Sequence, residues 1–175
     1  DLSARYHAEL ANGFGNLASR AIAMIGKYFD GLVPAPSGYT EDDLAIQRAL
    51  AKAAADADAA MERLAIHEAI EAIWTVVDDL NGYITVQEPW VLAKSEASRE
   101  RLGTVLYTVA EGLRALAVLL APVIPVATAK LWDAIGGTGE VSDQNIRSAG
   151  TWGQLTPGST VTAIEPLFPR IETAS

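Results

Sequence analysis

The chain has 175 residues, half of them hydrophobic, with a formal net charge of −9 and no cysteine. This length suffices for one domain with a sizeable core, and the lack of cysteine excludes disulfides, thiolate metal ligands and a cysteine nucleophile. The negative charge argues against broad nonspecific binding to nucleic acid, because such binding depends on neutralisation of phosphates by Lys and Arg.

The acidic residues are concentrated in one segment. Residues 40–80 contain ten acidic and three basic residues, whereas the rest of the chain contains twelve acidic and ten basic residues. The opening stretch and the region Lys94–Arg114 are therefore close to charge balance. This distribution is compatible with a small site that reads nucleic-acid bases, but not with a broad electrostatic one.

The first expected helix runs from about Ser3 to Phe29 and carries an unusual polar face. At about 100° per residue, this face collects Asn12, Asn16 and Arg20, with two glycines between the asparagines. Asn and Gly both lower helix propensity, and Gly costs about 1 kcal/mol relative to Ala. The residues alone leave two interpretations open: a functional surface, or a close helix–helix contact through the glycines with solvated asparagines around it.

Two further helices are expected after a Pro- and Gly-containing linker. Thr40 is a suitable N-cap for a helix that continues to about Ala60, with acidic residues in its first turn. The next helix begins near Leu64, and its apolar residues repeat at the spacing of a buried seam. The expected seam consists of Ile66, Ile70, Ile73, Val77, Leu80 and Ile84.

Pro89 and Trp90 follow this third helix directly. Proline disfavours helical geometry at the preceding residue, so Glu88 is expected to leave the helix and Trp90 to stand at a corner between two helices. A tryptophan at such a corner either plugs the end of a bundle or presents its ring to a partner. Both interpretations remain open at this point.

The remaining chain predicts two more helices and an extended tail. A fourth helix starts near Ser95 or Ser98, Pro122 and Pro125 interrupt the chain after it, and a fifth covers residues 126–135. The longest apolar run, residues 115–127, is too short and too broken for the roughly 20 residues of a membrane span, so we expect a soluble protein. We predict an all-α fold with a helical bundle over residues 1–137 and a tail of the same domain over 138–175.

Several segments resemble the anticodon-binding domain of methionyl-tRNA synthetases, and the likeness covers nearly the whole chain. Asn12-Gly-Phe-Gly-Asn16-Leu-Ala-Ser-Arg20 resembles the first bundle helix of that family, and Glu88-Pro-Trp90-Val-Leu-Ala-Lys94 resembles its Pro-Trp segment. The stretch from Leu120 to Trp132 resembles a helix junction shared with other class I synthetases. Leu167-Phe-Pro-Arg-Ile171 resembles a tail segment of bacterial members. The first two motifs indicate methionine specificity, and the others only the wider class I group.

The resemblance implies a five-helix anticodon-binding bundle, with an extended tail packed on it, that reads the CAU anticodon of tRNA-Met. In the family, the tryptophan after proline stacks on an anticodon base, which assigns this role to Trp90 with Pro89 before it. The helix Asn and Arg contact base edges, which assigns that role to Asn16 and Arg20, with Asn12 one turn earlier. The family usually has Ala before Pro-Trp, so Glu88 departs from this pattern and adds a negative charge beside the expected RNA site.

The chemistry of these residues fits single-stranded RNA, which is recognised by stacking splayed bases and bonding their edges. A stack on Trp90 is worth about 1–3 kcal/mol for any base, so discrimination requires polar groups. Donors of Arg20 suit the N3 and O2 acceptors of cytosine, and the carbonyl of Asn16 suits its N4 donor. Uracil would place its N3–H against an arginine donor, a mismatch worth roughly 1–3 kcal/mol.

The chain contains no segment like the ATP-handling motifs of class I synthetases and no Cys cluster like the family's zinc knuckle. We therefore expect no catalytic residue, metal ligand or cofactor in this fragment. By the resemblance, ATP with Mg²⁺ belongs to an N-terminal catalytic domain of a cytoplasmic methionine–tRNA ligase, and the partners are that domain and the tRNA-Met anticodon loop, with no membrane.

Three alternatives remain open. In the first, the chain is the anticodon domain of another class I synthetase. In the second, it is an acidic helical module that binds a basic protein through its second helix. The third is a small-molecule enzyme on a helical bundle, for which the sequence offers no Glu-x-x-His pair or Ser/His/Asp set.

Overall fold

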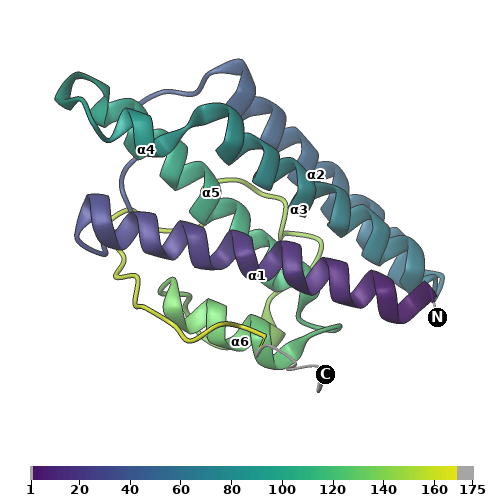
Figure 1. Cartoon of the computed structure of the whole chain (residues 1–175). Coiled ribbons are helices and arrows are strands. Elements are labelled where there is room, and N and C mark those ends of the chain that lie inside the picture. The colour runs from purple at the N-terminus through teal and green to yellow at the C-terminus, as the bar shows by residue number, and fades with distance from the viewer. Residues whose placement is uncertain (1, 169–175) are drawn as a thin grey trace, which may run out of the picture.

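Helix α5 (Arg99–Leu120) is the central element of the fold, which a computed structural model describes for residues 2–168 (Figure 1). Every residue from Leu102 to Leu120 is buried, because the helix is apolar on nearly all sides and other helices surround it. The segment Glu96–Leu120 is long and apolar enough to cross a bilayer, but its apolar window is entirely buried inside the protein. A bundle core explains this composition.

The other elements pack around α5 and confirm the predicted all-α fold. They are α1 (Leu2–Phe29), α2 (Glu41–Glu62), α3 (Ile66–Gln87), the short α4 (Pro89–Leu92) and α6 (Pro125–Ala134), with single 3₁₀ turns η1 (Glu96–Ser98) and η2 (Val141–Asp143). Five helices are long and α4 is a single turn. The described part of the chain contains no strand, only an isolated β-bridge between Leu32 and Thr160.

Helices α2 and α3 form an antiparallel hairpin (Figure 1). Alanines along α2 are buried and allow the two helices to approach closely. The predicted seam of α3 is buried from Ile70 to Ile84, but its expected first member, Ile66, is 50% exposed. Ile66 is the first residue of α3, beside the turn that joins α2 to α3.

Asp43, in the first turn of α2, is fully buried and holds three helices together. Its carboxylate accepts hydrogen bonds from the two terminal guanidinium nitrogens of Arg101, on α5, at 2.7 and 3.0 Å. It also accepts hydrogen bonds from the Tyr83 hydroxyl of α3 and from the Thr40 backbone N–H, the latter at 2.9 Å. Burial raises the pKa of Asp43, but these hydrogen bonds, with the largest contribution from Arg101, outweigh burial and leave the pKa below its usual value.

The tail, residues 138–168, lies along the bundle and is anchored to α5 by the buried Glu111. The Glu111 carboxylate accepts the backbone N–H groups of Gly153, Gln154 and Leu155 at 2.6, 3.0 and 3.0 Å. Arg114 donates to the same carboxylate at 2.7 Å and to the Ala149 carbonyl at 2.8 Å. The predicted packing of the tail is therefore confirmed over the described residues, while residues 169–175, including the end of its Leu167–Ile171 motif, lie outside them.

Replacement of Asp43 by Asn should lower the free energy of unfolding by about 2–3 kcal/mol. The expected loss is below the roughly 3–5 kcal/mol of a fully buried broken pair, because Arg101 is partly exposed. Since the folded-state pKa of Asp43 is depressed, its stabilisation is complete above the unfolded pKa of about 4 and disappears as the pH falls through the folded value. Urea unfolding from pH 7 to pH 2 should show the gap between wild type and D43N closing in acid. The exposed Asp56→Asn change should cost no more than about 0.5 kcal/mol; a similar loss in both variants would contradict the assignment.

Replacement of Glu111 by Gln should release the tail. A glutamine has one acceptor oxygen for three backbone N–H groups and leaves the buried Arg114 without its counter-charge, so a loss of about 3–5 kcal/mol is expected. Hydrogen exchange should accelerate at Gly153, Gln154 and Leu155. The matched Glu100→Gln change, at the exposed start of the same helix, should leave these amides protected.

Candidate nucleic-acid interface

The polar face of α1 is solvent-accessible along the residues that the sequence singled out. Asn12 and Asn16 are exposed and Arg20 is half-buried, whereas Phe14 and Leu17 on the opposite side belong to the core. A spacing of four residues puts each of the three polar side chains one turn from the next. The helix therefore offers a row of two amides and a guanidinium to solvent.

Gly13 and Gly15 of α1 lie in packing contacts with other parts of the chain. A side chain at Gly13 would lie 3.3 Å from Cγ1 of Val77, and the Gly13 carbonyl accepts a hydrogen bond from the Asn81 amide of α3 at 3.1 Å. A side chain at Gly15 would lie 3.2 Å from the ring of Phe168. The prediction of a close helix contact is thus confirmed at Gly13. The space over these two glycines is occupied, by α3 at Gly13 and by the tail at Gly15.

Phe168 also makes one wall of a shallow pocket of about 90 Å³ along this face. Asn12, Asn16 and Ser19 line its other side. Sequence reasoning missed both Ser19 and Phe168. The three-residue spacing from Asn16 to Ser19 signals a shared helix face, but no local pattern relates residue 168 to residue 15.

The second group of predicted residues stands on the short helix α4. Glu88 adopts left-handed backbone geometry (φ 47°, ψ 61°), which both ends α3 and begins α4. The predicted departure of Glu88 from the helix is confirmed. Its N–H still donates to the Ile84 carbonyl at 3.0 Å, and its carbonyl accepts from Val91 at 2.9 Å, so hydrogen bonds hold the corner on both sides.

Trp90 is displayed by this corner and does not plug it. Pro89 is buried, whereas Trp90 and Val91 are 40% and 46% exposed. A large aromatic ring left accessible on a hydrogen-bonded turn is suited to stacking against a planar partner. Of the two interpretations left open by the sequence, the structure supports the one in which the ring is presented outward.

The Asp43 network also fixes the position of the corner. Arg101 donates to the side-chain oxygen of Gln87 at 2.7 Å, and Gln87 is the last residue of α3, two positions before Pro89. Hydrogen bonding to Asp43 raises the pKa of Arg101 further above its ordinary value, so the guanidinium stays charged. Arg101 is therefore part of the support for Trp90 and is not available to a ligand.

Arg20 and the corner lie at the same end of the bundle. Helices α1 and α3 pack together and run in the same direction (Figure 1). They meet where Gly13 faces Val77 and Asn81. From this contact, Arg20 is about 10 Å further along α1 and the end of α3 about 10 Å further along α3, at 1.5 Å per residue. Asn12 lies near the contact itself, about 10 Å behind Arg20 along the helix axis.

Further basic side chains belong to this end. Arg99 donates to the Tyr28 carbonyl at 3.2 Å, and its guanidinium lies 4.4 Å from the ring centroid of Phe29. Lys94 follows α4 and is exposed. Lys94 and Arg99 are therefore near the corner, whereas other basic residues belong to α2, α5, α6 and the tail, and most of the acidic excess belongs to α2 and α3. Among the described residues, no group of three or more His, Asp or Glu is placed to hold a metal ion.

Comparison with protein families gives a match to the family described as the anticodon-binding domain of tRNA ligase, over residues 43–165. The matched range includes the Pro89–Trp90 corner but begins after α1. Among curated proteins, methionine–tRNA ligase of Streptomyces coelicolor is 48% identical over 98% of this chain, and that of Caldanaerobacter subterraneus is 39% identical over 96%. The chain covers 33% and 26% of the length of these relatives.

Solved structures of methionyl-tRNA synthetase are also similar to this chain. Mycobacterium tuberculosis methionyl-tRNA synthetase in complex with methionyl-adenylate superposes with a TM-score of 0.86 and 35% identity, over 96% of this chain and 33% of that one. Its apo form gives a TM-score of 0.86 and 36% identity, over 97% of this chain and 34% of that one. The likeness therefore includes α1 as well as the matched family range. The chain belongs to the family of anticodon-binding domains of tRNA ligases.

Proposed function

We propose that this chain is the anticodon-binding domain of a methionyl-tRNA synthetase and that it recognises the CAU anticodon of tRNA-Met. The names of the similar proteins support the methionine assignment. The structural observation that carries it is the exposed ring of Trp90 on a rigid corner, at the same end of the bundle as Arg20. This pair combines a stacking surface with a fixed donor group, which is what recognition of an unpaired base requires.

The two parts of the site do different work. The ring of Trp90 stacks on one anticodon base and contributes about 1–3 kcal/mol irrespective of which base it is. Arg20 and Asn16 then distinguish cytosine from uracil through N3, O2 and N4. Asn12 stands one turn away, beside the Phe168 pocket, and contacts a neighbouring nucleotide. The exposed Glu88 keeps phosphates away from the corner, so contacts to bases dominate there.

The remaining steps belong to the rest of the enzyme. Activation of methionine with ATP and Mg²⁺, and its transfer to tRNA in the cytoplasm, are assigned to a catalytic domain on the same polypeptide. The role of this chain is to bind tRNA-Met in preference to other tRNAs. The alternative of an acidic protein-binding module is not favoured, because the family match includes the acidic helices α2 and α3 themselves.

Replacement of Trp90 by Ala in the full-length synthetase should weaken binding of the tRNA-Met anticodon stem-loop by about 5- to 150-fold, the equivalent of 1–3 kcal/mol. The loss should be similar for CAU and UAU loops, because stacking does not discriminate between bases. Fluorescence titration would measure both. Trp90→Phe should recover much of the affinity, whereas Val91→Ala, at the adjacent exposed position, should change it little. Unchanged binding in Trp90→Ala would contradict the stacking role.

Replacement of Arg20 by Ala should reduce the discrimination between CAU and UAU anticodon loops. The ratio of CAU to UAU affinity should fall by about 5- to 150-fold, since a base-edge contact is worth roughly 1–3 kcal/mol. Arg63→Ala removes the same charge at the turn between α2 and α3, and should leave the ratio unchanged. If both variants weaken the two loops equally, Arg20 acts only through its charge and the base-reading role is wrong.

A further inference from the structure

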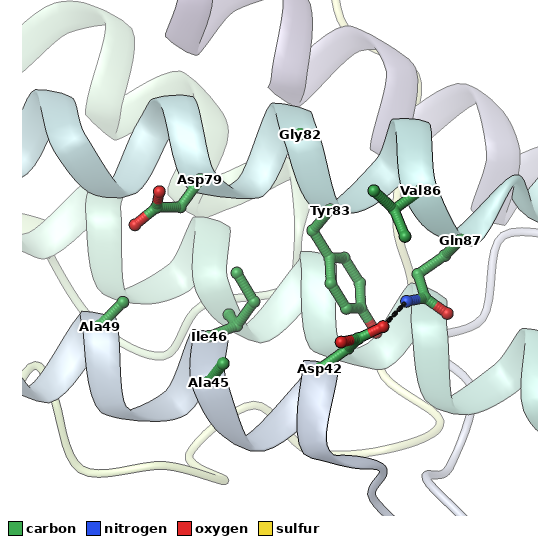
Figure 2. Close-up of a pocket in the computed structure, with 9 residues that line it drawn as sticks. All are labelled: Asp42, Ala45, Ile46, Ala49, Asp79, Gly82, Tyr83, Val86 and Gln87. Carbon is green, nitrogen blue, oxygen red and sulfur yellow. Dashed lines mark hydrogen bonds between the residues drawn. The ribbon is translucent and has the colours of Figure 1, made fainter.

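A groove runs between α2 and α3 (Figure 2), on the hairpin that contains most of the acidic excess, and its Gln87 end adjoins the corner at Glu88 and Pro89. Its volume is about 310 Å³, at the lower end of the range of small-molecule sites. The floor and walls are made by Ala45, Ile46 and Ala49 of α2 with Gly82 and Val86 of α3. Small side chains leave this space open: a Cβ added at Gly82 would meet no atom within 4 Å.

A carboxylate stands at each end of this groove. Figure 2 shows Asp42 beside Gln87 at one end and Asp79 above Ala49 at the other, with apolar side chains between them. Asp42 accepts one hydrogen bond from the Gln87 amide at 2.9 Å. Because this amide is neutral, the hydrogen bond leaves the charge of Asp42 uncompensated. Asp79 has no hydrogen bond or ion pair within the described part of the chain. The groove therefore has a formal charge of −2 with no cation to balance it.

The surroundings of Asp79 favour the arrival of a cation. Burial, and then the charge of the neighbouring Asp78, raise the pKa of Asp79 above its ordinary value. A positive group at this position would offset both effects by its attraction to the carboxylate. The nearby cations are committed elsewhere, because Arg101 is bound to Asp43 and Gln87, and Arg48 is paired with Glu41.

The distance between the carboxylates defines the length of the ligand. Asp42 and Ala49 are seven residues apart on α2, and Ala49 lies opposite Asp79, so the two carboxylates are about 10 Å apart along the helix axes. Each ammonium nitrogen lies about 2.8 Å from the oxygen that it binds, and an extended chain covers about 1.2 Å per bond, so chains of about four bonds or more between the two nitrogens can reach both carboxylates. A molecule with an ammonium at each end and methylenes between them matches the charges, the length and the apolar floor.

We propose that the α2–α3 groove binds linear aliphatic diamines and polyamines, with one ammonium on Asp42, another on Asp79 and the methylene chain over Ala45, Ala49 and Gly82. This site is independent of the anticodon-binding function. The ammonium groups supply donors without acceptors, which suits two carboxylates. The alkyl chain contributes by burial, at up to about fourfold in affinity for each methylene removed from water.

The test is an NMR titration of the 175-residue chain with 1,8-diaminooctane and spermidine, at constant ionic strength. The control ligand is 1-aminooctane, which has the same methylene chain but a single ammonium group. We expect saturable shifts of the Ala45, Ala49 and Gly82 amides, and affinity about two- to fivefold higher for 1,8-diaminooctane than for the monoamine, since the second ion pair is exposed. Low salt is preferred, because screening weakens exposed ion pairs.

Three variants make the test decisive. Asp79→Asn should weaken 1,8-diaminooctane binding by about two- to fivefold, whereas Asp78→Asn, the same charge change on a residue that does not line the groove, should have a smaller effect. Gly82→Leu should block binding by filling the groove, without a clash in the folded protein. Equal affinity for 1,8-diaminooctane and 1-aminooctane, or equal losses in the two Asp variants, would show that the two carboxylates do not each bind an ammonium and would overturn the proposal. Binding of a lysine-rich peptide at this groove without any binding of diamines would also overturn it.

Discussion

The buried carboxylate of Asp43 is the interaction on which the position of the candidate site depends. It joins the start of α2 to Tyr83 of α3 and Arg101 of α5, and Arg101 extends the network to Gln87 at the end of α3. Charge-assisted hydrogen bonds of this kind are shorter and stronger than neutral ones and restrict geometry. The hydrogen bonds of Asp43 and Arg101 therefore fix the position of the corner that follows Gln87. This explains how the Trp90 ring can remain exposed and still keep a defined orientation: buried polar groups set its position, and its own packing does not.

The tail contacts α5, the linker after α1 and α1 itself. It is held to α5 by Glu111, and further along it pairs with the linker after α1, where the Val33 N–H donates to the Ser159 carbonyl at 2.9 Å. It then reaches Gly15 through Phe168. The row of polar residues on α1 is therefore bounded by the tail on one side. Residues that are extended and irregular by local pattern thus shape the surface beside Asn12 and Asn16.

Charge is separated within the molecule. The α2–α3 hairpin contains most of the acidic excess, while Arg20, Lys94 and Arg99 belong to the end that displays Trp90. The two regions adjoin at Gln87, whose amide binds Asp42, so only the acidic residues further along the hairpin lie beyond the screening length of about 8 Å at physiological ionic strength. An RNA backbone is repelled by the hairpin and tolerated at the corner, which favours a small site that reads bases. The same separation leaves the hairpin groove free to attract small organic cations.

The sequence by itself determined the helices and the face that α1 presents. Thr40, Pro89 and the prolines after α5 set helix boundaries, and the spacing of Asn12, Asn16 and Arg20 set a common face, because hydrogen bonds and neighbours within a helix are fixed by residues three or four apart. Tertiary structure decided what these faces meet. An acid in a first turn is ordinarily a surface residue, yet Asp43 is buried because Arg101, 58 positions later, lies beside it. The covering of Gly15 by Phe168 and the placement of Asp42 and Asp79 at the two ends of the groove likewise depend on the register between packed elements, which no local pattern encodes.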